Sequence, residues 1–297
     1  MNFKSWFAGT LTLAFVSMNL ISCGPGEEGN GTGDGGNRDT GANMTISVDG
    51  KIFSIPSPFQ TAMLIKRAGA TYDKKVLNSP DRVKGYATRM QKALNLGVYG
   101  ADLGYVTMYD QNQDAIAYFQ ASQKLADDLG VSGAFQKTLI ERFKNNIGNK
   151  DSMLVLVAGA YRSADNFLKN NDRSDIGALI VAGGWIEALY FAVNVNKSKA
   201  NEEIKQRIAE QKISLGNLIG LLETYAGREE YAEILNGLRD LKRDFEGVDY
   251  RYVYEKPITD EGSKTTTFTS KTTVNITAEQ LNSISSKVEG LRSLIVE

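Results

Sequence analysis

Apolar residues recur every three or four positions along most of the chain, the spacing of helices that bury one face. Val83, Ala87, Met90 and Leu94 show this period, and no proline interrupts the chain between Pro80 and Pro257. The pattern predicts helices near residues 57–77, 80–109, 111–129, 133–147, 150–170, 175–195, 199–226 and 229–246, with a break near 97–100 and a last helix after Thr277. The loops between them are short, so successive helices should run antiparallel.

Two stretches depart from the helical period. Asp49-Gly50 lies between two short runs of alternating polar and apolar residues, a strong signal for a hairpin over residues 45–55. Residues 250–276 are rich in Tyr and Thr, which favour strands. We therefore expect a second hairpin or an extended excursion there.

The predicted fold is all-α: a single array or bundle of about eight or nine antiparallel helices with one or two short β-hairpins, over residues 44–297. An alternative is two packed helical halves that meet near residue 197. Thr277 with Gln280 predicts a capping box for the last helix. Asp110 begins a run with part of the spacing of a calcium loop, but the glycine and glutamate that such a loop needs are absent, so Asp110 is interpreted as a helix N-cap.

Glycines within the predicted helices indicate where helices approach closely. Gly183-Gly184 lies beside Trp185, and Gly216 and Gly220 have the spacing of two small residues one turn apart. Because glycine has no Cβ, both pairs predict tight packing against a neighbouring helix.

The first 22 residues have the pattern of a targeting segment rather than part of the fold. One charge, Lys4, precedes a mainly apolar stretch that ends in Leu20-Ile21-Ser22-Cys23. This order resembles the lipobox of bacterial lipoproteins, which implies cleavage before Cys23 and attachment of lipid to its thiol. An ordinary secretory signal followed by a chance cysteine is the alternative. Lipid chains such as palmitate would then form the membrane anchor.

Residues 24–43 are rich in glycine and acidic residues and contain no large apolar side chain, so they predict a disordered tether after residue 23. Acidic residues soon after the lipidated cysteine resemble lipoproteins of the Bacteroidota. The layout of the whole chain also resembles helical lipoproteins of that phylum. The resemblance implies an outer-membrane location, in either the periplasmic leaflet or the surface leaflet.

Composition excludes several kinds of chemistry. The 297 residues include no histidine and one cysteine, so no Ser-His-Asp triad, His-ligated zinc site or intramolecular disulfide can form. Lys and Arg total 34 and Asp and Glu total 35, a formal charge of −1 that argues against a nucleic-acid partner. We expect no metal and no cofactor.

Glu187 is the single charge in the otherwise apolar stretch from residue 178 to residue 193. A helix with that composition is buried on nearly all sides, and a buried carboxylate needs a partner. Arg162 lies in a similar apolar setting, with Asp165 one turn on. Glu187 either forms a structural ion pair, points to solvent, or lines a ligand pocket together with Arg162.

A second polar group lies on the predicted helix 80–109. Asp102, Tyr105 and Tyr109 fall on one face of it, together with Val98. A carboxylate flanked by phenols can orient a sugar or another polar ligand, but such an acid is more often buried and satisfied within the fold.

Together these features favour a lipid-anchored envelope protein that acts as a non-enzymatic binding or scaffold module, with a possible protein partner in the envelope. Two alternatives stay open. One is a carboxylate-based hydrolase, which needs two acidic side chains facing a cleft. The other is an accessory nutrient-capture lipoprotein of an outer-membrane transporter.

Overall fold

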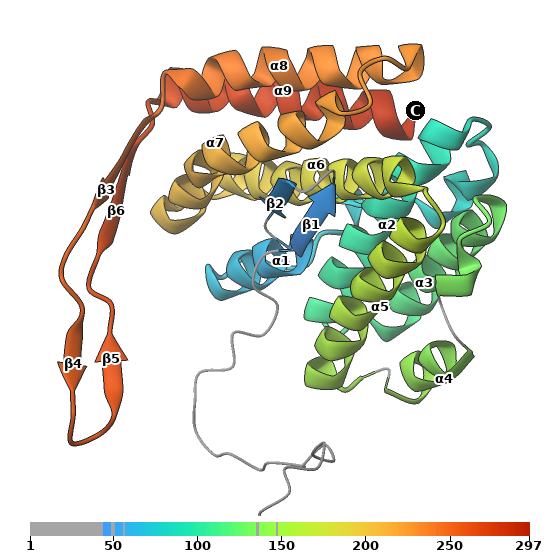
Figure 1. Ribbon diagram of the computed structural model, residues 1–297, viewed down its shortest axis with the longest axis horizontal. Helices are drawn as coiled ribbons and strands as arrows, with labels where there is room; N and C mark the ends of the chain where they lie inside the picture. Colours follow the sequence, from blue (N-terminus) through green and yellow to red (C-terminus); the bar gives the residue numbers. More distant parts are fainter. Residues whose placement is uncertain (1–43, 49–50, 56, 135–136, 147) are drawn as a thin grey trace, which may run out of the picture. The chain divides into compact units, whose positions relative to one another are not determined.

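The computed structural model describes residues 44–48, 51–55, 57–134, 137–146 and 148–297, all within one compact unit. The predicted targeting segment, Cys23 and the tether lie outside the described residues. The α-helices of this part are α1 Pro58–Arg67, α2 Arg89–Met108, α3 Asn112–Asp128, α4 Lys137–Asn146, α5 Lys150–Asn170, α6 Ser174–Ser198, α7 Glu202–Glu223, α8 Ala232–Glu246 and α9 Ala278–Val296 (Figure 1). Short 3-10 turns occupy Lys74–Val76, Pro80–Lys84, Ser132–Ala134 and Glu229–Tyr231. The all-α prediction is confirmed.

Helix α6 lies at the centre of the bundle, in contact with α1, α2, α5, α7 and α9 (Figure 1). It is apolar on nearly all sides and is buried along most of its length, as the sequence predicts. Buried apolar side chains from Phe59 to Val296 form one continuous core around it, with members on both sides of residue 197.

Helices α2 and α6 touch through their backbones. A Cβ atom placed on Gly97 would lie 1.9 Å from the carbonyl oxygen of Ile180, and one on Gly183 would lie 1.9 Å from that of Leu94. Only glycine fits at such a distance, so the expectation of tight packing at Gly183 is confirmed. Gly216 differs, because a Cβ there would meet nothing within 4 Å. The prediction of tight packing at Gly216 is therefore wrong.

The structure corrects several predicted helix limits. Helix α1 ends at Arg67, where Gly69 adopts a φ of 79°, so the prediction of a helix to residue 77 is wrong. Helix α2 begins after a capping box at Thr88 and Gln91 and continues without a break to Met108. The predicted break near residues 97–100 is wrong, because α2 is continuous there and Gly97 lets α6 approach closely.

Asp110 does not cap a helix. Its φ is 58°, its carboxylate pairs with Lys66 at 3.1 Å, and the residue before α3 is Gln111. The N-cap prediction for Asp110 is therefore wrong, because the chain turns through this residue in the left-handed region to reverse direction after α2. The capping box of Thr277 and Gln280 before α9 is confirmed.

Two hairpins accompany the helices. Strands β1 Met44–Val48 and β2 Lys51–Ile55 pair antiparallel, and β2 lies against α7. The second hairpin joins α8 to α9 and carries two successive pairings: β3 Asp249–Val253 with β6 Lys271–Asn275, then β4 Ile258–Asp260 with β5 Thr265–Thr267. We call residues 249–275 the arm. Figure 1 shows it extending away from the ends of α8 and α9.

The arm contains a bulge between its two pairings. Val253 pairs with Lys271, and the next pair along the ribbon is Ile258 with Thr267, so four residues on one strand face three on the other. Ser270 closes this interval by exchanging hydrogen bonds of 3.1 Å with the backbone of Glu255. The bulge lets the chain change register and bend before the outer part of the arm.

Candidate functional site

The most deeply buried charges of the described residues meet between α6 and α9. Glu187 is 0% exposed, and its two carboxylate oxygens accept hydrogen bonds from Nε and Nη2 of Arg292 at 3.1 and 3.2 Å. The guanidinium also lies over the ring of Tyr190, 4.7 Å from its centre. A two-point pair of this kind neutralises a carboxylate that burial would otherwise make costly.

A second carboxyl group, that of Asp102 on α2, lies against the first. Asp102 is also 0% exposed, its Oδ2 accepts from the backbone N–H of Asn78 at 3.3 Å, and its side chain shares a hydrogen bond with Glu187. Burial, followed by the charge of Glu187, raises the pKa of Asp102 well above its usual range. Burial also raises the pKa of Glu187, although Arg292 opposes that rise.

Burial and the neighbouring charge thus favour the neutral form of Asp102, while Arg292 favours the charged form of Glu187. Glu187 faces the guanidinium of Arg292, whereas no cation of the described residues forms an ion pair with Asp102. No hydrogen-bond donor among the described residues reaches Oδ1 of Asp102. A neutral acid that donates a hydrogen bond in an apolar site is a known consequence of burial.

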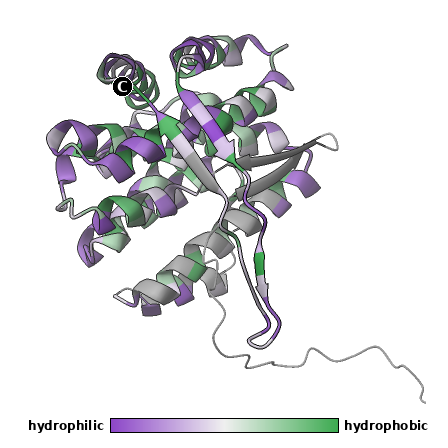
Figure 2. Cartoon of the chain, turned by 90° about the vertical axis from the view of Figure 1, so that its left-hand side faces the viewer, coloured by the Kyte–Doolittle hydropathy of each residue, from purple (hydrophilic) through white to green (hydrophobic). Residues whose placement is uncertain are grey.

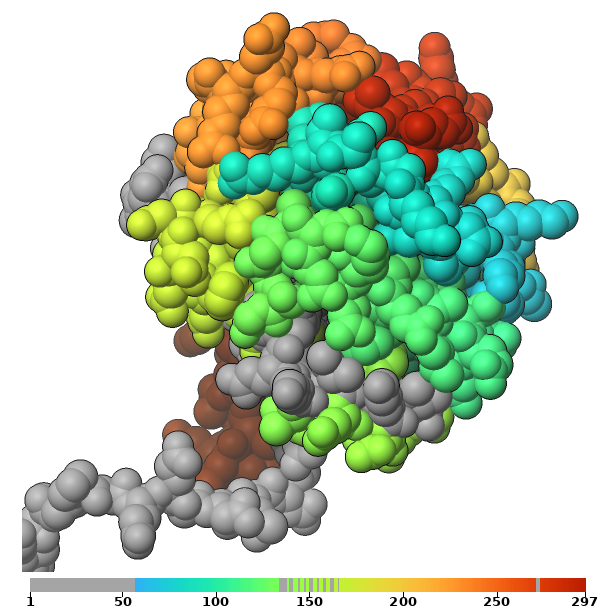
Figure 3. Space-filling view, turned by 90° about the vertical axis from the view of Figure 1, so that its right-hand side faces the viewer, coloured from blue at the N-terminus to red at the C-terminus, as the bar shows by residue number. Residues whose placement is uncertain are grey.

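Amide side chains extend this polar cluster to the end of the chain. Asn78 donates to the hydroxyl of Tyr86 at 2.8 Å and to Asn95 at 3.1 Å, and Asn95 donates to the carbonyl oxygen of Ile295 at 2.7 Å. Arg82 binds the carbonyl oxygen of Val296 at 3.0 Å. Figure 3 shows the result from outside, with the end of α9 beside the segment that precedes α2. The cluster thus fixes the last turn of α9 onto α2.

The phenols predicted to accompany Asp102 serve another contact. The hydroxyl of Tyr105 accepts from the backbone N–H of Asp73 at 3.2 Å, and that of Tyr109 donates to the carbonyl oxygen of Ala70 at 2.8 Å. Their rings lie 4.8 Å apart, and burial raises the pKa of both. Asp102, Tyr105 and Tyr109 do lie along one side of α2, but the two hydroxyls hold the loop after α1 rather than face a common pocket.

The structure describes the side chain of Glu187 but not those of Arg162 and Asp165, the other two charged residues predicted for the site. Glu187 is buried and paired as expected, and its partner among the described side chains is Arg292. Arg162 and Asp165 are on α5, and their side chains lie outside the described part of the structure, as does Cys23. Arg292 is the residue that sequence reasoning missed. Its signal is faint: it lies four residues after Val288, at the edge of the apolar face of α9.

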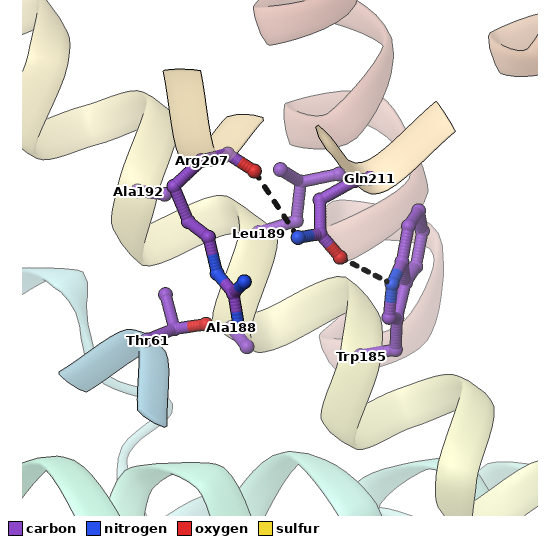
Figure 4. A pocket seen from close by; sticks show the side chains of 7 residues that line it. All are labelled: Thr61, Trp185, Ala188, Leu189, Ala192, Arg207 and Gln211. Carbon is purple, nitrogen blue, oxygen red and sulfur yellow. Dashed lines mark hydrogen bonds between the residues drawn. The ribbon is translucent and has the colours of Figure 1, made fainter. Parts of the chain in front are cut away.

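One small hollow opens between α1, α6 and α7. Figure 4 shows its lining: Thr61, Trp185, Ala188, Leu189, Ala192, Arg207 and Gln211. Gln211 closes it from within, because it accepts from the indole N–H of Trp185 at 3.0 Å and donates to the carbonyl oxygen of Arg207 at 3.1 Å. With about 10 Å³ of free interior, the hollow has room for about one water molecule.

The surface of the arm differs from that of the helical body. Four of its large apolar side chains are mostly exposed: Tyr252 at 62%, Tyr254 at 68%, Ile258 at 64% and Phe268 at 78%. Figure 2 views the molecule from this side and shows short green apolar segments within a ribbon that is otherwise pale or purple. Exposed apolar side chains gathered on one element mark an interaction site more often than scattered ones do.

The described ranges contain no group of three or more acidic or cysteine side chains placed to hold a metal ion. One of their helices, α6, is long and apolar enough to cross a membrane, but 89% of its most apolar window is buried inside the bundle. That burial is typical of the core helix of a globular domain.

Comparison of the chain with protein-family models, with curated proteins and with solved structures gave no match. The function of the chain therefore has to be argued from its own residues. Two features stand out: a closed carboxyl cluster inside the bundle, and an arm with exposed aromatic side chains outside it.

Proposed function

We propose that this protein is a lipid-anchored, non-enzymatic binding or scaffold module of the bacterial envelope, and that the arm is its docking element. The observation that carries the proposal is the exposure of Tyr252, Tyr254, Ile258 and Phe268 on a ribbon that extends from the helical body. A ribbon with exposed apolar side chains and exposed outer strands is suited to bind another polypeptide strand.

The interior of the bundle supports the same assignment. A hydrolase that uses two carboxyl groups needs them to face a cleft where substrate and water can enter. Asp102 and Glu187, the acids that the fold brings together, are 0% exposed and bound to each other and to Arg292. This arrangement favours a structural role for the pair and leaves the arm as the better candidate for contact with a ligand.

The anchor in this proposal comes from the sequence Leu20-Ile21-Ser22-Cys23. Replacing Cys23 with Ser should move the protein from the membrane fraction to the soluble fraction, because no thiol is left to receive lipid. The variant Phe268→Asp serves as the control and should stay with the membrane. Membrane association of Cys23→Ser equal to that of the wild type would contradict the anchor.

The docking role is tested by a photo-reactive amino acid placed in the arm in living cells. At position 268 we expect covalent adducts of higher mass, whereas Val155, an apolar residue of α5 that is 57% exposed, provides a matched control position. Figure 1 places α5 on the far side of the body from the arm. Adducts at both positions alike, or at neither, would contradict a docking role for the arm.

A further inference from the structure

The outer part of the arm is an incomplete sheet. Strands β4 and β5 pair with each other, and all six of their residues are exposed. The hydroxyls of Thr259 and Thr266 share a hydrogen bond of 3.2 Å across the ribbon. A two-stranded ribbon without a packed face is marginally stable in water, and a third or fourth strand is the usual way to stabilise it.

The two edges of this outer ribbon have different chemistry. Residues 255–261 carry Glu255, Lys256, Asp260 and Glu261, together with Pro257, which cannot donate a backbone hydrogen bond. Residues 265–270 read Thr-Thr-Thr-Phe-Thr-Ser, without a charge and without a proline. Charges and proline protect a strand edge against pairing, so the first edge is protected and the second is open.

We propose that a second copy of this chain pairs with the open edge, so that two arms form a four-stranded antiparallel sheet through residues 265–270. The inference deepens the proposed function and rests on it, since it names the partner of the same arm. The segment can pair with its own copy in an antiparallel register centred on Phe268. Phe268 then lies opposite Phe268 of the copy, Thr267 opposite Thr269, and Thr266 opposite Ser270. Aromatic pairs and Thr–Thr or Thr–Ser pairs are among the cross-strand contacts that stabilise sheets.

The same chemistry explains why such an assembly would stop at two copies. Pairing open edge to open edge is a two-fold contact, which uses the same residues on both copies and closes on itself. The strands left outermost then carry Pro257 and the charges near it, so they resist further addition. Anchoring both copies in one membrane would raise their effective concentration and favour the pair.

Self-pairing is tested first by the oligomeric state of the purified full-length Cys23→Ser chain, measured by analytical ultracentrifugation over a range of concentrations. We expect a reversible dimer. Phe268→Asp should weaken the association at least about tenfold, because it places two carboxylates opposite each other. Val155→Asp, on α5, should not change it. Since Phe268 is 78% exposed, both variants should keep the wild-type melting temperature.

A charge-pairing experiment separates self-association from any other effect of the substitution. Phe268→Asp and Phe268→Lys should each be monomeric, and a mixture of the two should restore the dimer. Phe268→Cys in the Cys23→Ser chain should form a disulfide-linked dimer under mild oxidation, whereas Val155→Cys should not. A wild-type chain that stays monomeric at every concentration, or a dimer indifferent to Phe268→Asp, would overturn the inference.

Failure of this inference is distinguishable from failure of the proposed function. If position 268 yields photo-adducts with a different protein while the purified chain is monomeric, self-pairing is wrong and the arm remains a docking element. If Phe268→Asp abolishes the dimer and the adducts together, the partner of the arm is the second copy.

Discussion

At the scale of single residues, the pair of Glu187 and Arg292 joins two elements 105 residues apart in the chain. Both side chains leave water to meet, and each is tolerable in the core because the other is present. The Glu187 side chain is 0% exposed and that of Arg292 is 13% exposed. Removing one partner of such a pair costs more than the pair adds in net stability, because the other charge stays buried.

Replacing Glu187 with Ala should lower the free energy of unfolding by roughly 3–5 kcal/mol, because it leaves the guanidinium of Arg292 buried without a partner. Urea denaturation measures the loss. Glu289→Ala is the matched control: Glu289 pairs with Lys197 at the surface, and such pairs contribute at most about 1 kcal/mol. Replacing Arg292 with Met as well should recover part of the loss. Equal effects of Glu187→Ala and Glu289→Ala would contradict this role.

The raised pKa of Asp102 gives the free energy of unfolding a pH dependence of known sign. Its folded pKa is raised, so the folded state binds more protons than the unfolded state between the two pKa values. Stability from this group is therefore fully present below the unfolded pKa, about 3.9, and is lost as pH rises through the folded pKa. The slope is at most about 1.4 kcal/mol per pH unit.

Asp102→Asn should remove that dependence, because the amide still accepts from Asn78 and still donates to Glu187 but cannot ionise. Near the unfolded pKa the free energy of unfolding of the variant should equal that of the wild type. As pH rises, the variant should become the more stable protein. Urea denaturation at several pH values measures the difference in free energy of unfolding between the two proteins. The other titrating groups are the same in both proteins, so their contributions cancel in this difference. A difference that stays constant with pH would contradict a protonated Asp102.

At the scale of elements, the contact between α2 and α6 depends on the absence of side chains. The carbonyl oxygen of Leu94 occupies the place where a Cβ on Gly183 would lie. The helices are in backbone contact at this point, which brings Asp102 on α2 within reach of Glu187 on α6. Close packing of the two helices and formation of the carboxyl pair are thus linked.

Gly183→Ala should destabilise the protein by at least about 3 kcal/mol, since neither backbone can move without opening the core. Gly216→Ala on α7 is the matched control, because a Cβ there meets nothing within 4 Å. It should stabilise the protein by about 0.5–1 kcal/mol through its better helix propensity. Thermal unfolding of the two variants should therefore shift in opposite directions, and shifts of the same sign would contradict the packing described.

At the scale of the whole molecule, one hydrophobic core connects the helices before and after residue 197. Helix α9 returns after the arm to pack against α2, α6 and α8. The helical body should therefore unfold as one unit, while the arm, with few buried side chains, is the most accessible segment of residues 148–297.

Limited trypsin treatment should cut the region 57–297 first in the arm, at Lys264, which is exposed and lies in the turn between β4 and β5. The two fragments should stay together on a sizing column, because α9 remains packed in the core. Replacing Lys264 with Gln should slow this first cut. A first cut near residue 197 that yields two separately stable halves would instead support two packed helical halves.

The sequence by itself determined the local structure. The helices were predicted from the spacing of apolar residues, the long stretch without proline and the capping residues. The hairpins were predicted from Asp49-Gly50 and from the runs of Tyr and Thr. These signals can be read from the sequence because each acts within a few residues. It also determined that Glu187 lies in a buried helix, since fifteen of the sixteen residues from 178 to 193 are uncharged.

Only the tertiary structure decided what these elements meet. Contacts between distant segments pair Glu187 with Arg292 and raise the pKa of Asp102. They also bond the hydroxyls of Tyr105 and Tyr109 to the loop after α1. The exposure of Phe268 depends on where the hairpin leaves the body. Hydrophobic burial is not directional, so a sequence pattern shows that a face is buried but not which side chain it will meet.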